Sequence, residues 1–139
     1  MGEAALATAP APFSADMLNG ATMQGESNGR RFGANGQLLT SSAGALGEMQ
    51  VLPSTARDPG FGVRPWQGGA DDLARVGRDY RATMQNRYGG DLSKMWAAYN
   101  AGPGRVDAAV SRLGPSWLTA MSPTTRAYVA RNLKSLGAQ

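Results

Sequence analysis

Apolar residues recur at helical spacing over residues 71–88, and this is the clearest pattern in the chain. The stripe consists of Leu73, Val76, Gly77, Tyr80 and Met84. Two aspartates at its start suit the positive end of a helix dipole, and Gly89-Gly90 is a strong stop signal. We therefore predict an amphipathic helix over 71–88 whose stripe faces the core.

Four further helices are predicted from similar signals at their ends. They span residues 14–26, 91–101, 104–113 and 122–136. Ser14 and Asp91 carry side-chain oxygens suited to capping a helix start, and Pro123 suits a first helical position. In this reading Glu26 lies at the C-terminal end of the first helix.

Residues 27–70 are rich in turn-forming residues and contain no long apolar stripe at helical spacing. Asn35-Gly36 is a strong signal for a two-residue hairpin turn. We predict a short helix over 42–50, one helical turn over 53–57 and a Gly- and Pro-rich loop over 58–70. The expected fold is mainly α (α+β), with at most one small β-hairpin near 31–40.

The length of 139 residues is enough for one domain with one core. Residues 1–13 are rich in Ala and Pro and are expected to form a flexible leader, with residues 14–139 as the folded domain. The leader lacks the basic and apolar regions of a secretory signal peptide. No stretch approaches the roughly 20 apolar residues that a membrane span requires. We therefore expect a single domain without a membrane span.

The chain contains no histidine and no cysteine. This composition excludes Ser-His-Asp triads, thiol nucleophiles and metal sites built from imidazole or thiolate ligands. We expect no metal and no cofactor, and a carboxylate is then the natural acid or base. Of the three glutamates, Glu3 lies in the leader, which leaves Glu26 and Glu48, with Asp58 behind them.

The net charge is +4, a balance that suits a polyanionic partner such as nucleic acid or the bacterial surface. The arginines are spread along the chain and form no dense block with aromatic residues, so solvated helix faces explain the charge better than a nucleic-acid site. A nucleic-acid binder is an alternative that rests on charge alone, and no nucleic-acid partner is expected.

Glu26 lies between Gly25 and Ser27, two small residues beside which a sugar can approach. Cleaving a glycosidic bond needs a proton for the leaving oxygen, and burial in an apolar pocket keeps a carboxyl protonated near neutral pH. Each signal alone also has a structural explanation. A glutamate at a helix end is usually solvated, and Met49 and Tyr99 at helical spacing belong more often to a core than to a site.

Glu26-Ser27 is followed by two longer motifs in a fixed order. The pattern Ser-x-x-Gly-Ala-x-Gly-x-Met-Gln-x-x-Pro-x-Thr-Ala is matched from Ser41 to Ala56, and Ala-Tyr-Asn-Ala-Gly from Ala98 to Gly102. Together they resemble the soluble (SLT-type) lytic transglycosylases, which have a goose-type-lysozyme-like fold. The resemblance covers nearly the whole chain.

The resemblance implies that Glu26 is the single catalytic acid and base of a peptidoglycan lytic transglycosylase. Such an enzyme cleaves the β-1,4 bond between N-acetylmuramic acid and N-acetylglucosamine and forms a 1,6-anhydro ring. By the same resemblance, six residues are expected to contact the substrate: Ser27, Met49, Gln50, Tyr99, Asn100 and Tyr128.

Two positions depart from the family pattern. The fourth motif, Glu-Thr-x-x-Tyr-Val, begins here with Thr124, so a supporting carboxylate is absent. Glu48 stands where the family often has an apolar residue, and a Glu48 that faced the cleft would act as a second carboxylate and favour hydrolysis. The alternatives are therefore a hydrolytic muramidase (lysozyme) on the same fold and a non-catalytic wall-binding virion module.

Three segments look like transglycosylase domains embedded in phage virion proteins: Asp58–Pro65, Gly77–Tyr80 and Arg87–Gly90. This resemblance implies action on the periplasmic cell wall during phage wall penetration or lysis. Delivery by a virion fits the lack of a signal peptide, and so does a domain cut from a longer exported chain. The expected partners are peptidoglycan glycan strands, together with other virion proteins or a longer parent chain.

Overall fold

The computed structural model describes residues 13–137, and the regular secondary structure within them is almost entirely helical. The α-helices are α2 (Ala15–Ser27), α3 (Pro53–Arg57), α4 (Ala70–Arg87), α5 (Leu92–Ala101), α6 (Pro103–Leu113) and α7 (Pro123–Ser135), and a 3-10 helix, η1, spans Gly114–Ala120. The mainly α class predicted from the sequence is confirmed. The predicted leader lies, apart from Phe13, outside the described residues.

Side-chain caps explain where several helices begin. The Ser14 hydroxyl accepts a hydrogen bond from the Met17 amide, and the Asp91 carboxylate accepts one from the Lys94 amide. These bonds satisfy amide groups that have no partner inside the helix. The helices predicted over 14–26, 71–88 and 91–101 are each found within one residue of the expected bounds.

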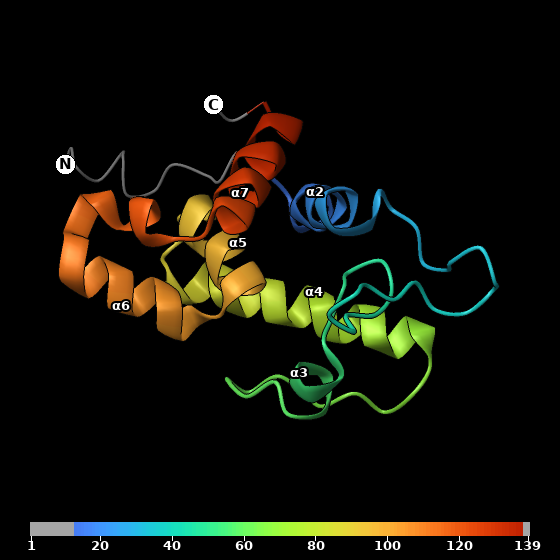
Figure 1. Ribbon diagram of the computed structural model, residues 1–139. Coiled ribbons are helices and arrows are strands. Elements are labelled where there is room, and N and C mark those ends of the chain that lie inside the picture. Colours follow the sequence, from blue (N-terminus) through green and yellow to red (C-terminus); the bar gives the residue numbers. More distant parts are fainter. Residues whose placement is uncertain (1–12, 138–139) are drawn as a thin grey trace.

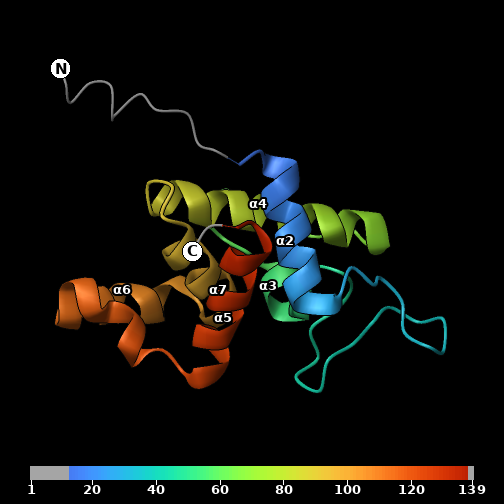
Figure 2. The same ribbon diagram turned by 90° about the horizontal axis from the view of Figure 1, so that it is seen from above.

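Helix α5 lies at the centre of the fold and packs against α4, α6 and α7. Helix α4 crosses the middle of the molecule, with α6 beyond one end and the loop after α2 towards the other (Figure 1). Helices α2 and α7 lie side by side in both views (Figure 2). The Trp96 ring of α5 is fully buried, and its Nε1 donates to the Thr22 hydroxyl of α2 at 2.9 Å. A directional hydrogen bond therefore orients the Trp96 ring at the centre of the core, in addition to apolar packing.

The segment between α2 and α3 is a folded loop with isolated antiparallel bridges. The predicted hairpin is reduced to a single bridge between Phe32 and Leu38. The prediction of a helix over 42–50 is wrong. Gly44 and Gly47 have φ values of +90° and +74° there, and left-handed residues at this spacing do not fit a right-handed helix.

Gly77 lets this loop approach helix α4. A Cβ atom at position 77 would lie 2.6 Å from the Cβ of Met49 and 3.2 Å from the hydroxyl of Tyr99. Glycine is therefore required for the loop to rest on the helix at this point. The predicted stripe on α4 supports this packing as well, because Leu73 and Val76 are buried beside Met49.

The chain continues directly from α6 into η1, which begins at Gly114 and includes Pro115. Trp117 anchors η1 in the core. Within residues 13–137, the helices are too short or too polar to cross a membrane.

Candidate active site

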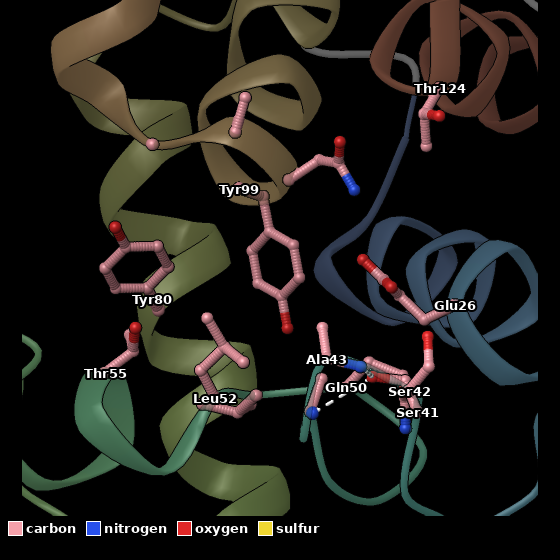
Figure 3. A pocket seen from close by; sticks show the side chains of 15 residues that line it. Glu26, Ser41, Ser42, Ala43, Gln50, Leu52, Thr55, Tyr80, Tyr99 and Thr124 are labelled. Carbon is pink, nitrogen blue, oxygen red and sulfur yellow. Dashed lines mark hydrogen bonds between the residues drawn. The ribbon is translucent and has the colours of Figure 1, made fainter. Parts of the chain in front are cut away.

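A cleft of about 580 Å³ opens between the ends of α2 and α7 on one side and α4, α5 and the 28–52 loop on the other (Figure 3). Its lining comprises Glu26, Ser41, Ser42, Ala43, Ala45, Gln50, Val51, Leu52, Thr55, Tyr80, Tyr99, Asn100, Ala101, Gly102 and Thr124. The three sequence motifs thus meet at one site, although they are far apart along the chain.

Glu26 projects into this cleft from the last turn of α2 (Figure 3). Burial raises the pKa of its carboxyl from 4.5 to about 7, because the charged form loses contact with water. The Tyr128 hydroxyl and the positive charge of Arg131 oppose this shift by favouring the carboxylate. Among the described residues, Glu26 is the one acidic side chain in the cleft lining. Its proton is therefore exchangeable near neutral pH.

Tyr128 lies next to Glu26 but outside the cleft lining. Its ring is buried, and its hydroxyl makes no hydrogen bond of regular geometry to any described group. The nearby charge of Glu26 and the burial together raise the pKa of Tyr128 well above 10, with burial the larger cause. Arg131 lies 5.9 Å from the centre of the Tyr128 ring and donates to the carbonyl oxygen of Gly25. Tyr128 is thus an uncharged hydroxyl placed behind the carboxyl.

Glu48 is held away from the cleft. Its carboxylate accepts hydrogen bonds from Arg31 Nε at 2.9 and 3.1 Å and forms an ion pair with Arg31 Nη2 at 2.8 Å. Arg31 also pairs with Asp71 at 2.5 Å, which ties the loop to the start of α4. The contacts of Glu48 are structural, and they give no support to a second carboxylate in the cleft.

Besides Tyr128, two further predicted substrate contacts, Ser27 and Met49, do not line the cleft. The buried Ser27 hydroxyl donates to the carbonyl oxygen of Glu48 at 2.8 Å. Met49 is 1% exposed, and its carbonyl oxygen accepts a hydrogen bond from the Tyr99 hydroxyl at 2.7 Å. The structure thus gives both residues a role in holding the loop, which differs from the contact expected from sequence.

Gln50 and Asn100 both line the cleft, and each has one polar end already engaged. The amide nitrogen of Gln50 donates to the carbonyl oxygen of Gly47 at 2.7 Å, and within residues 13–137 its Oε1 accepts no hydrogen bond and is available as an acceptor. The Asn100 Oδ1 accepts from the Thr125 hydroxyl at 2.7 Å. Thr125 itself accepts from Ser122, so its proton must point to Asn100. Asn100 therefore presents its NH₂ group as a donor.

Sequence reasoning placed Tyr80 only in the buried stripe of α4, yet it also forms part of the cleft wall. Its ring meets that of Tyr99 edge to face, with centroids 5.9 Å apart. The sequence contained a hint of this position, because Tyr80 is the one tyrosine in the predicted stripe. A phenol hydroxyl usually needs a polar partner or contact with solvent. Thr55 and Ser42 also line the cleft wall. Apart from their place within the second motif, nothing in the sequence around them indicated this position.

The family model described as the transglycosylase SLT domain matches residues 16–116. The chain belongs to this family. The family resemblance predicted from the motifs is thereby confirmed.

A solved structure supports the fold of this SLT domain. It is the X-ray structure of an inactive glutamate-to-glutamine mutant of the lytic transglycosylase Slt from Pseudomonas aeruginosa, with a TM-score of 0.69 and 27% sequence identity. The match covers 88% of this chain and 22% of that chain. The SLT domain therefore spans about a fifth of the length of the protein it matches.

Proposed function

We propose that this SLT domain is a peptidoglycan lytic transglycosylase. It would cleave the β-1,4 bond between N-acetylmuramic acid and N-acetylglucosamine and form 1,6-anhydro-N-acetylmuramic acid. The observation that carries the proposal is Glu26, a cleft carboxyl with a pKa near 7. The similar Slt protein supports it, because that protein is inactive when one glutamate is replaced by glutamine.

In the first step, the protonated Glu26 carboxyl donates its proton to the oxygen of the scissile bond. The bond from that oxygen to the muramyl C1 breaks, and the N-acetylglucosamine leaves with a hydroxyl group. A carboxyl with a pKa close to the working pH is suited to this step, because a large fraction is protonated and the proton is readily released.

In the second step, the Glu26 carboxylate accepts the proton of the muramyl C6 hydroxyl. The C6 oxygen then bonds to C1 and closes the 1,6-anhydro ring, which restores protonated Glu26 without consuming water. The nucleophile belongs to the substrate, so no second carboxylate is needed to activate a water molecule. The engagement of Glu48 by Arg31 outside the cleft is consistent with this one-carboxylate scheme.

Four neighbouring groups are proposed to assist. Tyr128 and the Arg131 charge both favour the carboxylate form of Glu26, which is the form produced by the first step. Across the cleft, Gln50 offers an acceptor and Asn100 a donor. These two groups are complementary to the N–H and the carbonyl of an acetamido substituent.

Analysis of the products of purified peptidoglycan by mass spectrometry tests this proposal. We expect muropeptides that are one water lighter than hydrolysis products. Glu26→Gln should reduce their release by about 10²- to 10⁴-fold, the usual contribution of general acid–base catalysis, with the circular dichroism spectrum unchanged. Hydrated products with reducing ends would instead identify a muramidase. Wall binding without any cleavage would identify a binding module.

Glu48→Gln is the matched control for Glu26→Gln, because it makes the same change at a carboxylate outside the cleft lining. We expect Glu48→Gln to release anhydro products while lowering thermal stability. If Glu48→Gln abolished cleavage at a temperature where the variant remains folded, the one-carboxylate scheme would be wrong.

We also propose that the domain acts on the bacterial wall as part of a phage particle. This rests on the resemblance of the Asp58–Pro65 segment to domains in virion proteins. Detecting its peptides by mass spectrometry in purified particles would support the proposal. Finding them only in the lysate of infected cells would contradict it.

A further inference from the structure

Phe61 has an unusual conformation for a large aromatic residue. It lies in the loop between α3 and α4 with φ at +54°, between Gly60 at +70° and Gly62 at +79°. Glycine adopts such angles freely, but a bulky residue there is strained. The Phe61 side chain is also half exposed, at 50%. The fold therefore holds a strained aromatic ring in contact with water, a combination that points to a functional role.

The Phe61 ring continues a row of aromatic rings that begins in the cleft. Its centroid lies 6.3 Å from that of Tyr80 in an edge-to-face contact, and Tyr80 meets Tyr99 in the same way at 5.9 Å. Tyr80 and Tyr99 line the cleft, whereas Phe61 does not. The row thus extends the cleft wall beyond Tyr80 to the surface.

A charged network steadies the Phe61 ring. The Arg87 guanidinium lies 5.4 Å from the ring centre, a favourable cation–π distance. Arg87 is in turn paired with Asp107, which accepts a hydrogen bond from the Tyr88 hydroxyl at 2.8 Å. Because Asp107 neutralises Arg87, this surface presents an apolar ring beside a compensated charge. It is better matched to an uncharged apolar face than to an anion.

We propose that Phe61 forms an additional saccharide-binding position outside the cleft, which holds one pyranose ring of a glycan strand by its C–H face. This inference rests on the proposed function for its choice of ligand. A β-1,4-linked sugar with equatorial substituents presents axial C–H groups on its faces. Such polarised hydrogens are attracted to the negative face of an aromatic ring. Two ring-to-ring steps separate Phe61 from Tyr99, so a strand bound in the cleft would reach Phe61 by continuing beyond Tyr80.

Phe32 provides a matched control. It is a phenylalanine of nearly equal exposure, 51%, in the loop after α2, and it is absent from the cleft lining. Phe61→Ala should raise the KM for long glycan strands about 3- to 10-fold more than the KM for a tetrasaccharide. Phe32→Ala should raise both to the same small extent. Phe61→Tyr should retain the preference for long strands, because it keeps the aromatic face.

A binding measurement separates this inference from the proposed function. In a Glu26→Gln background, isothermal titration calorimetry with long and short peptidoglycan oligosaccharides reports affinity without chemistry. We expect Phe61→Ala to weaken binding of the long ligand selectively, even if the wild-type products prove to be hydrated. Equal loss for long and short ligands, loss equal to that of Phe32→Ala, or no loss at all would overturn the proposal.

Discussion

The hydroxyl of Ser27 donates a hydrogen bond to the main-chain carbonyl oxygen of Glu48 at 2.8 Å. The residue next to Glu26 thereby fastens the end of α2 to the loop that carries part of the cleft wall. The position of the carboxyl and the shape of the wall are therefore coupled through one buried bond.

Ser27→Ala should remove this coupling. We expect a loss of about 1 to 2 kcal/mol in the free energy of unfolding, because the buried carbonyl of Glu48 loses its partner. The rate at saturating substrate should fall more than the apparent affinity, since the cleft wall loosens around the carboxyl. Urea denaturation and steady-state kinetics measure the two effects. Unchanged stability together with a raised KM would instead indicate direct substrate binding by Ser27.

The pKa of Glu26 predicts how stability depends on pH. The native carboxyl retains its proton up to about pH 7, whereas the same group in the unfolded chain ionises near pH 4.5. The folded state therefore binds more protons between these values, and stability falls as the pH rises through this window, by about 3 kcal/mol at most. Glu26→Gln should be more stable than the wild type at pH 8 and close to it at pH 4.5. Urea titrations at both pH values check this, and equal differences at the two pH values would argue against a buried carboxyl.

The same pKa predicts the basic limb of the activity profile. In the proposed first step Glu26 must be protonated, so kcat/KM should fall as the pH rises above about 7. Arg131 lowers this pKa by favouring the carboxylate. Arg131→Gln should therefore move the basic limb to higher pH. Rates measured from pH 5 to 9 test both statements, and a limb that does not move would show that Arg131 has no influence on the carboxyl.

Gly77→Ala should disrupt the contact between α4 and the loop. The added methyl group would lie 2.6 Å from the Cβ of Met49, which cannot rotate away. We expect a loss of about 1 to 3 kcal/mol from overpacking, together with reduced activity. Gly20→Ala in α2 is the matched control, because nothing lies within 4 Å of its new methyl group. That variant should gain up to about 1 kcal/mol from helix propensity. Equal thermal shifts in the two variants would contradict the packing argument.

Thr125→Val should release the side chain of Asn100. The buried Thr125 hydroxyl donates to Asn100 Oδ1, and valine has the same shape without the donor. We expect the KM for peptidoglycan oligosaccharides to rise several-fold while the pH dependence of the rate stays the same, because Glu26 is untouched. A shifted pH profile would show that the substitution acts on the carboxyl instead.

Much of the helical framework could be predicted from local sequence. Helix α4 has a stripe at helical spacing with glycines beyond its end, and helix α5 has the cap Asp91. These signals act within a few residues, so one sequence contains them completely. The loop over 42–50 was misjudged because short apolar and glycine-containing segments fit either a helix or a turn. Met49 of this loop packs against Gly77, and local sequence does not reveal this contact because it joins residues far apart in the chain.

The candidate site divides in the same way. The absence of histidine and cysteine, together with the register of the motifs, identified Glu26 as the expected acid from sequence alone. The sequence left open whether Glu48 faces the cleft as a second carboxylate. The difference between Glu26 and Glu48 arises from partners distant in sequence. Glu48 meets Arg31 and becomes a structural ion, whereas Glu26 enters a cleft where burial keeps its proton. Residue types and spacings therefore determined the helices and the chemistry available. Only the tertiary structure decided which carboxyl is desolvated, because desolvation depends on every segment that packs around the group.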